Sequence, residues 1–219
     1  IILNGSPRKN FNTAILLKEA QRGAETAGAE VEYFNLYDYN FKGCISCLAF
    51  KRKNATTNGL CAIKDDIRPI LEKCLHADAV IMGSPVYFSY PTGELRSFIE
   101  RWLYPAHTYM VDKENGGLKR FLDRKIPSAV IFTMNLPEEA AKGYNYDIIL
   151  NENINCIGHV MGYAEALYSY DTCQFDDFSK YDCDLFNETD KAKVRDSQFP
   201  VDMQKAFDLG KRFATLKID

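Results

Sequence analysis

The sequence lacks the features that mark several common protein classes. Its 27 basic and 30 acidic residues give a formal net charge of −3, without the positive excess that nucleic-acid-binding proteins carry. No apolar run approaches the roughly 20 residues of a membrane-spanning helix, and no signal peptide is visible. We therefore expect no nucleic-acid partner and no membrane association, and we expect the protein in the cytoplasm.

Disulfide scaffolding, repeats and linkers are missing as well. The seven cysteines are odd in number and scattered, unlike the dense, even set of a small secreted domain. With 219 residues, of which 46% are hydrophobic, the chain can bury a sizeable core. We predict a single domain over residues 1–219, with an irregular loop at 37–64 and a C-terminal extension at 171–219.

Short apolar runs alternate with helical patterns along the chain. Strands are expected at 1–4, 31–36, 79–82, 126–132 and 163–170, and helices near 12–27, 65–75, 92–104, 146–161 and 201–215. Such alternation is typical of a doubly wound parallel sheet. The sequence therefore predicts an α/β fold, a three-layer α/β/α sandwich around a five-stranded parallel sheet. Ligands of such sheets lie beyond the carboxyl ends of the strands.

A polar loop joins the first expected strand to the first expected helix. Backbone N–H groups at a helix N-terminus lack intrahelical partners, and the helix dipole favours an anion there. Short donors and a cation surround this point, so the loop indicates a phosphate site. The candidate side chains are those of Ser6, Arg8, Asn10, Asn12 and Thr13.

The kind of phosphate follows from two missing motifs. Neither the P-loop pattern G-x-x-x-x-G-K-[ST] nor the dinucleotide pattern G-x-G-x-x-G occurs in the chain. A loop rich in hydroxyl and amide groups suits a phosphate monoester such as that of FMN. The alternative is an ordinary strand-to-helix turn in which Asn12 or Thr13 caps the helix.

Two further loops are expected at the same edge of the sheet. Residues 83–93 carry two prolines and three aromatic side chains, which suits a flat heteroaromatic ligand. In the other reading these aromatics fill the core or a subunit interface. Thr133 and Asn135 follow the strand at 126–132 and could hydrogen bond to the edge of a ring. Alternatively, they simply follow an ordinary strand end. The candidates in the first of these loops are Pro85, Val86, Tyr87 and Phe88.

Together these motifs resemble those of the flavodoxin-like NAD(P)H-dependent FMN reductases, in the branch related to the iron–sulfur flavoproteins. The resemblance covers residues 1 to about 170. The motifs that carry it are Gly5-Ser6-Pro7-Arg8 with Asn12-Thr13, then Gly83-Ser84-Pro85-Val86-Tyr87, then Thr92-Gly93-x-Leu95-x-x-Phe98-Ile99-x-Arg101.

The resemblance implies a flavodoxin-like fold and a bound FMN that carries the chemistry, with no catalytic side chain. The phosphate would rest on the 6–13 loop, the ring on residues 85–88, and Thr133 would lie near the pyrimidine edge. It further implies hydride transfer from NAD(P)H to FMN and on to a quinone, nitro compound, flavin or metal ion, with ping-pong kinetics. Homodimers or homotetramers with the flavin close to a subunit interface are typical of such proteins. The alternative activity is that of a flavodoxin-type electron carrier without a substrate of its own.

Cysteines and acidic residues raise the question of metal binding. Cys44, Cys47 and Cys61 fall in the 37–64 loop, where the iron–sulfur flavoproteins carry a compact cysteine run. This chain has Leu48-Ala49-Phe50 where a third close cysteine would be expected. We therefore predict reduced thiols and no metal, and an iron–sulfur cluster, a zinc site or a redox pair are the alternatives. The acidic and aromatic segment 171–199 is expected to form an ordered wrap over the subunit or its partner.

Overall fold

The computed structural model describes residues 1–114, 116–119 and 121–218. Five parallel strands form the sheet in the order β2-β1-β3-β5-β6. The prediction of an α/β sandwich around a five-stranded parallel sheet is therefore confirmed. The strands are β1 (Ile2–Asn4), β2 (Tyr33–Asn35), β3 (Val80–Tyr87), β5 (Ser128–Thr133) and β6 (Ala164–Ser169).

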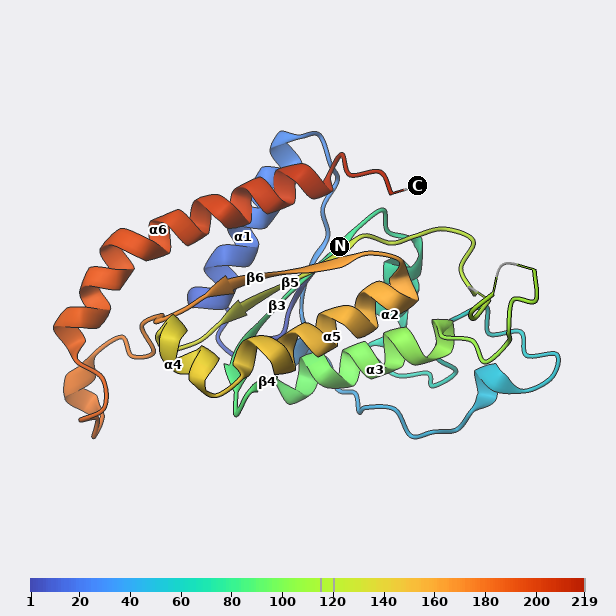
Figure 1. Ribbon diagram of the computed structural model, residues 1–219, viewed down its shortest axis with the longest axis horizontal. Helices are drawn as coiled ribbons and strands as arrows, with labels where there is room; N and C mark the ends of the chain where they lie inside the picture. Colours follow the sequence, from blue (N-terminus) through green and yellow to red (C-terminus); the bar gives the residue numbers. More distant parts are fainter. Residues whose placement is uncertain (115, 120, 219) are drawn as a thin grey trace.

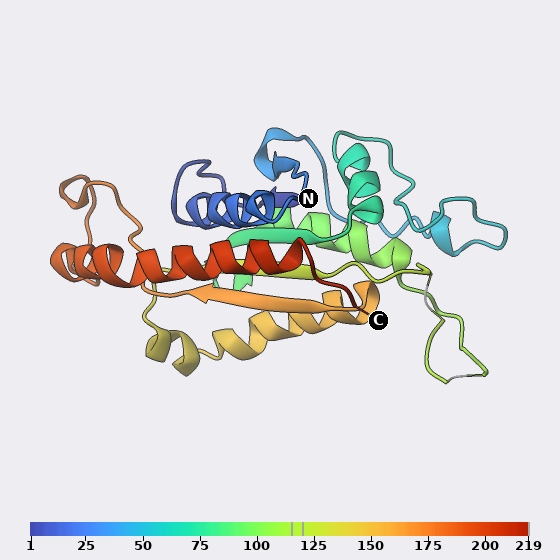
Figure 2. The same cartoon turned by 90° about the horizontal axis from the view of Figure 1, so that it is seen from above.

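Helices cover both faces of this sheet (Figure 1). One face carries α1 (Asn12–Thr26) and the long α6 (Glu188–Phe213), and Figure 2 shows α6 running along the sheet. The other face carries α2 (Arg68–His76), α3 (Gly93–Ala106) and α5 (Tyr146–Met161), with the short α4 (Glu138–Gly143) before α5. Among the described residues, no helix combines the length and apolar character that a bilayer span requires.

Side chains of alternate strand residues pack into two separate hydrophobic clusters, one on each face of the sheet. Ile2 and Ile81 pack with Leu16 and Leu17 of α1, whereas their neighbours Leu3 and Met82 pack toward α3. Successive side chains of a strand point to opposite faces, so a sheet buried on both sides needs continuous apolar runs. The short runs read from the sequence have this origin.

The third strand is longer than predicted. We expected it to end at 82 and residues 83–93 to form a loop, but β3 continues to Tyr87 and turns back into β4 (Tyr90–Pro91). Pro85 and Val86 therefore lie on a strand, and that part of the prediction was wrong. Gly83 O accepts the Gly5 N–H, so these backbone groups face β1. Pro85, two residues further, faces the same side beyond the end of β1, where its missing N–H costs no ladder hydrogen bond.

The C-terminal part is more helical than predicted. Helix α6 begins at Glu188, not near 201, and continues through Pro200. Its start is capped by Asn187, whose side-chain oxygen accepts the Asp190 N–H at 3.2 Å. The expected wrap is thus irregular only up to residue 187, apart from one 3-10 turn at Phe178–Lys180.

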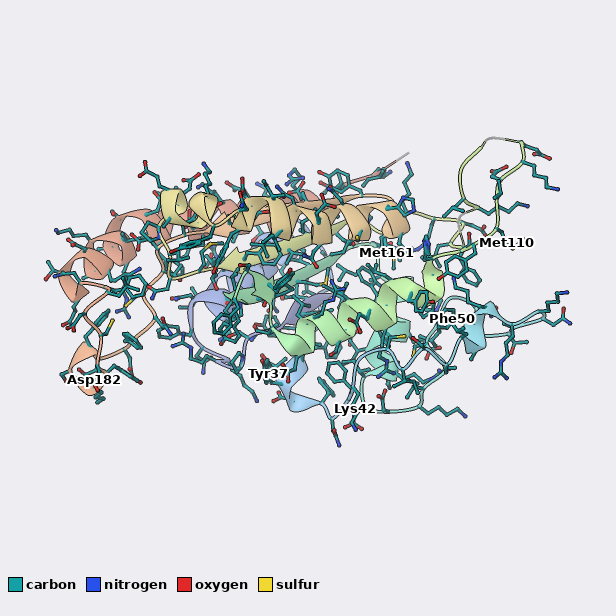
Figure 3. The ribbon with its side chains drawn as sticks, turned by 60° about the horizontal axis from the view of Figure 1, so that its bottom comes forward. Tyr37, Lys42, Phe50, Met110, Met161 and Asp182 are labelled. Carbon is teal, nitrogen blue, oxygen red and sulfur yellow. The ribbon has the colours of Figure 1, made fainter. Side chains whose placement is uncertain are left out.

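Arg101 anchors the long loop that follows β2. Its guanidinium is fully buried and forms an ion pair with Asp65. It also donates to the carbonyl of Lys42 at 3.2 Å and to the sulfur of Cys61 at 3.4 Å. Burial by itself lowers the pKa of Arg101, but the hydrogen bonds and charge interactions with Asp65 and Cys61 together outweigh it and raise this pKa. Figure 3 shows Lys42 on the loop that runs beside α3, so one α3 side chain organises much of this loop.

Candidate functional site

A cavity of about 360 Å³ opens at the carboxyl ends of the strands. Loops after β1, β5 and β6 and the end of β3 line it, as expected for a ligand site in a doubly wound sheet. All but two of the predicted side chains lie around it. Those that line it are Ser6, Arg8, Asn12, Thr13, Pro85, Val86, Tyr87, Thr133 and Asn135.

The N-terminus of α1 points to this cavity without a side-chain cap. The helix starts at Asn12, its N-cap position is occupied by Phe11, and no side chain of the described residues accepts a hydrogen bond there. The first turn also contains no acidic residue. The alternative in which Asn12 or Thr13 caps the helix was therefore wrong. Uncapped N–H groups and a positive dipole end make this point attractive to an anion.

Ser6 and Thr13 supply buried hydroxyl groups on either side of the helix start. The Ser6 N–H donates to the side-chain oxygen of Asn4 at 3.0 Å, and the Arg8 N–H donates to Ser6 Oγ at 3.1 Å. Thr13 Oγ1 lies 2.7 Å from Thr133 Oγ1, which ties the loop after β1 to the end of β5. The Ser6 hydroxyl also donates to the carbonyl of Arg8 at 3.4 Å, a long hydrogen bond that a phosphate oxygen would replace.

Arg8 and Asn12 contact the segment after β6. Arg8 Nη1 donates to the carbonyl of Gln174 at 2.7 Å, and the guanidinium carbon lies 3.8 Å from the centre of the Phe11 ring. Asn12 Nδ2 donates to the carbonyl of Cys173 at 2.7 Å. A guanidinium has five N–H groups and an amide has two, so both side chains keep donors for a ligand.

Asn135, which follows β5, also lines the cavity. Asn135 Nδ2 donates to Gln174 Oε1 at 2.9 Å. Its Oδ1 is buried and finds no hydrogen-bond partner among the described residues. A buried acceptor without a donor is costly, so this atom marks a place where a bound donor or water would lower the free energy.

Two predicted site residues lie outside the cavity. Asn10 Oδ1 accepts from Lys18 Nζ at 2.9 Å on the surface. Phe88 sits at the tip of the β3–β4 hairpin, where its side chain is 95% exposed and its φ is 49°. The structure thus separates these residues from the other candidates.

Four cavity residues come from the C-terminal extension and were not predicted. They belong to the segment expected only to wrap the subunit, and its many aromatic side chains were the one available signal. Their position depends on the long-range path from β6 to α6, which local patterns do not report. They are Thr172, Gln174, Phe175 and Tyr181.

All seven cysteines are unpaired, and the three in the long loop lie in different environments. Cys61 is buried against Arg101, Cys44 is half-buried and Cys47 is exposed. In the part of the chain that the structure describes, no group of three or more His, Cys, Asp or Glu side chains is placed to hold a metal ion. That these thiols are free of metal therefore stays a prediction.

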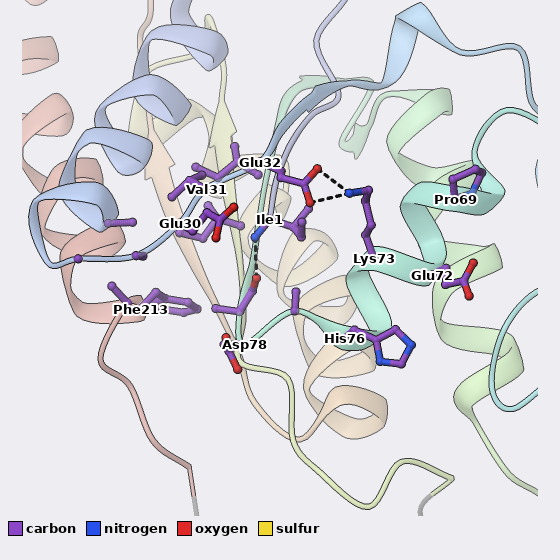
Figure 4. A pocket seen from close by; sticks show the side chains of 18 residues that line it. Ile1, Glu30, Val31, Glu32, Pro69, Glu72, Lys73, His76, Asp78 and Phe213 are labelled. Carbon is purple, nitrogen blue, oxygen red and sulfur yellow. Dashed lines mark hydrogen bonds and ion pairs between the residues drawn. The ribbon is translucent and has the colours of Figure 1, made fainter.

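A second, larger cavity of about 840 Å³ lies at the amino ends of the strands (Figure 4). There Lys73 Nζ bonds both carboxylate oxygens of Glu32 at 2.7 Å, so these two charged groups satisfy each other. Ligands of parallel sheets bind at the other end of the strands, so we place the candidate site in the smaller cavity.

The strand order and the cavity at its carboxyl edge define a flavodoxin-like α/β protein. Solved structures agree with this fold. The chain resembles an NAD(P)H:quinone oxidoreductase from Methanothermobacter marburgensis with a TM-score of 0.65 and 16% identity, over 99% of this chain and 97% of that one. It resembles an azoreductase from Bacillus anthracis with a TM-score of 0.65 and 10% identity, over 96% and 97% of the two chains.

Sequence comparison identifies the family. Residues 1–124 match the model of the NADPH-dependent FMN reductases, and the chain belongs to this family of enzymes. It is 37% identical over 99 residues to an iron-sulfur flavoprotein of Methanocaldococcus jannaschii, which is 45% of this chain and 49% of that protein. It is 34% identical over 164 residues to an iron-sulfur flavoprotein of Clostridioides difficile, covering 74% and 64%. The chain spans about half the length of several of these relatives.

Proposed function

We propose that this protein is an FMN-dependent oxidoreductase that takes hydride from NAD(P)H and passes it to a small acceptor such as a quinone, a nitro compound, a flavin or a metal ion. The uncapped N-terminus of α1 beside buried Ser6 and Thr13 is the observation that carries this proposal. FMN, when bound, supplies the hydride-accepting ring, so the protein needs no acid–base residue of its own.

The donors at the phosphate loop fit a phosphate monoester. The N–H groups of the first turn of α1, the hydroxyl groups of Ser6 and Thr13 and the spare N–H groups of Arg8 and Asn12 would hold its oxygens. The family membership supports a flavin at this place. The cavity volume of about 360 Å³ lies within the range of small-molecule sites.

The remaining walls suit a flat ring. Pro85, Val86 and Tyr87 form one side, and their strand pairing with β4 and β5 makes this side rigid. Thr133 and Asn135 line the cavity as well and offer polar groups to the edge of a ring. Because one cavity would serve the nicotinamide donor and the acceptor in turn, we propose ping-pong kinetics. As the resemblance implies, we also propose a homodimer or homotetramer with the flavin close to a subunit interface.

An anaerobic titration followed by visible absorption tests the activity. We expect the purified, FMN-reconstituted protein to show flavin bands that bleach when NADPH or NADH is added and return with a quinone. Bands that persist with both nucleotides and show a stable one-electron form would indicate an electron carrier. A broad additional absorption that is lost when bound iron is removed would overturn the prediction of metal-free thiols. A protein that leaves added FMN fully fluorescent would contradict the proposal.

The double substitution Ser6→Ala and Thr13→Ala is expected to weaken FMN binding a hundredfold or more. Each hydroxyl would contribute a hydrogen bond to a charged oxygen, worth about 1.5–3 kcal/mol, and every 1.4 kcal/mol is a tenfold change in the dissociation constant. The dissociation constant is measured by quenching of FMN fluorescence. Asn10→Ala is the matched control, because Asn10 lies on the same loop but outside the cavity. Unchanged affinity in the double variant would rule out this loop as the phosphate site.

A further inference from the structure

The segment Asp171–Asn187, here called the C-terminal strap, leaves β6 at the carboxyl edge of the sheet and leads into α6. It lies outside residues 1–124, which match the family model. Figure 3 shows Asp182, within the strap, at the end of the molecule opposite Met110. The strap therefore adds material beyond the matched segment at the end where the candidate site lies.

The first residues of the strap bond to both ligand loops. Arg8 and Asn12 of the phosphate loop each donate to a strap carbonyl at 2.7 Å. From the other side, the Thr172 N–H donates to the carbonyl of Met134 at 2.9 Å. The side chains of Gln174 and Asn135 are hydrogen bonded at 2.9 Å. The strap thus joins the loop after β1 to the loop after β5 across the cavity mouth.

Two aromatic rings of the strap form a wall of the cavity. Phe175 and Tyr181 are stacked with ring centres 4.3 Å apart and planes at 17°, and both line the cavity. Phe178 packs edge-on against Phe175 at 5.1 Å. Stacked aromatic rings of this kind offer a flat apolar surface to a ligand. Such a wall suits an aromatic nucleotide better than a bare phosphate ion.

A buried cation at the start of α6 joins the two ends of the strap to each other and to the loop after β5. Lys191, at the start of α6, is 3% exposed and forms an ion pair with Asp171 at 2.5 Å. It also donates to the carbonyl of Asn135 at 2.5 Å and lies 4.5 Å from the centre of the Phe186 ring. Removal of such a buried partner is costly. The strap is therefore held at its two ends, and its middle contributes Phe175 and Tyr181 to the cavity wall.

We propose that the C-terminal strap is the retaining wall of the FMN site, with Phe175 and Tyr181 in contact with the bound nucleotide. This inference rests on the proposed function. Arg8 and Asn12 have donors for both the phosphate and the strap carbonyls. A bound phosphate would therefore hold these two side chains in the position from which they bond the strap. Release of FMN requires the strap to move away from the phosphate loop, and strap contacts therefore set the rate of release.

The test measures FMN dissociation from the reconstituted full chain by recovery of FMN fluorescence on dilution. Phe175→Ala with Tyr181→Ala is expected to raise the dissociation rate roughly tenfold, the effect of losing about 1.4 kcal/mol of contact. Tyr181→Phe keeps the ring and is expected to keep the rate of the unmodified protein. Leu185→Ala is the matched control, because Leu185 lies in the strap, is 81% exposed and is not part of the cavity wall.

A second, milder variant shows whether faster release of FMN results from the lost ring or from misfolding. Tyr181→Ser replaces a side chain that is 49% exposed and is expected to raise the rate a few-fold with an unchanged far-UV circular dichroism spectrum. If the unmodified protein retains FMN and both ring-removing variants release it at the same rate, the strap proposal is overturned and the phosphate site stands. An equal rise in the dissociation rate of Leu185→Ala would also overturn the proposal, because Leu185 is not part of the cavity wall. If the unmodified protein does not bind FMN, the proposed function itself fails.

Discussion

Substitution of Gly210 by alanine is expected to destabilise the protein by about 3 kcal/mol or more. A Cβ at this position would lie 1.8 Å from the carbonyl oxygen of Ala20 and 2.6 Å from its carbon. These are backbone atoms of α1, so the contact is relieved only if the two helices move apart and lose their packing. The free energy of unfolding is measured by urea denaturation.

The same close approach occurs on the facing helix, which provides an independent check. A Cβ on Gly23 would lie 1.9 Å from the carbonyl oxygen of Phe207, so Gly23→Ala is expected to have a similar effect. Gly143→Ala is the control, since nothing lies within 4 Å of its Cβ and the residue is helical. It is expected to be neutral or to stabilise by up to about 1 kcal/mol. Equal denaturation midpoints for all three variants would contradict the direct backbone contact of α1 and α6.

Arg101→Met is expected to cost roughly 3 kcal/mol of stability and to loosen the loop at 37–64. The change removes the ion pair with Asp65 and the hydrogen bonds that hold Lys42 and Cys61, all from a fully buried side chain. Breaking a buried ion pair leaves its other member without compensation. Denaturation gives the stability, and hydrogen exchange of the loop amides shows whether the loop opens.

A surface lysine of α6 separates this effect from general loss of charge. Lys193 is exposed and pairs with Asp190 at 2.7 Å on the same helix. Lys193→Met is expected to cost less than about 1 kcal/mol. The role assigned to Arg101 would be refuted by equal losses in the two variants, or by loop amides that exchange as slowly as in the unmodified protein.

Local patterns were sufficient for much of the fold and for part of the site. The apolar runs at 1–4, 79–82 and 126–132 indicate buried strands because they are short and alternate with helical patterns, as in a parallel sheet that is covered on both faces. The polar loop before α1 was recognisable because a helix start needs partners for its N–H groups. The same reasoning did not separate Asn10 from Asn12, since both are short amides on one loop and only the loop path directs one to the cavity.

Other features depend on contacts between distant segments. The continuation of β3 through Pro85 was not predicted, because a proline in a strand is acceptable only where the neighbouring strand has ended. Helix α6 starts before its predicted position and passes Pro200, because a side-chain cap at Asn187 and packing against α1 outweigh the helix-breaking tendency of proline.

The sequence by itself determined the class of fold, and it predicted the place of a phosphate loop and the kind of ligand that this loop suits. These follow from periodicity and from local backbone chemistry, which act over a few residues. Only the tertiary structure decided that Phe175 and Tyr181 close the cavity and that Arg8 bonds Gln174. Arg8 and Gln174 are far apart in the chain, and it is the burial of the sheet and of α6 that brings them together.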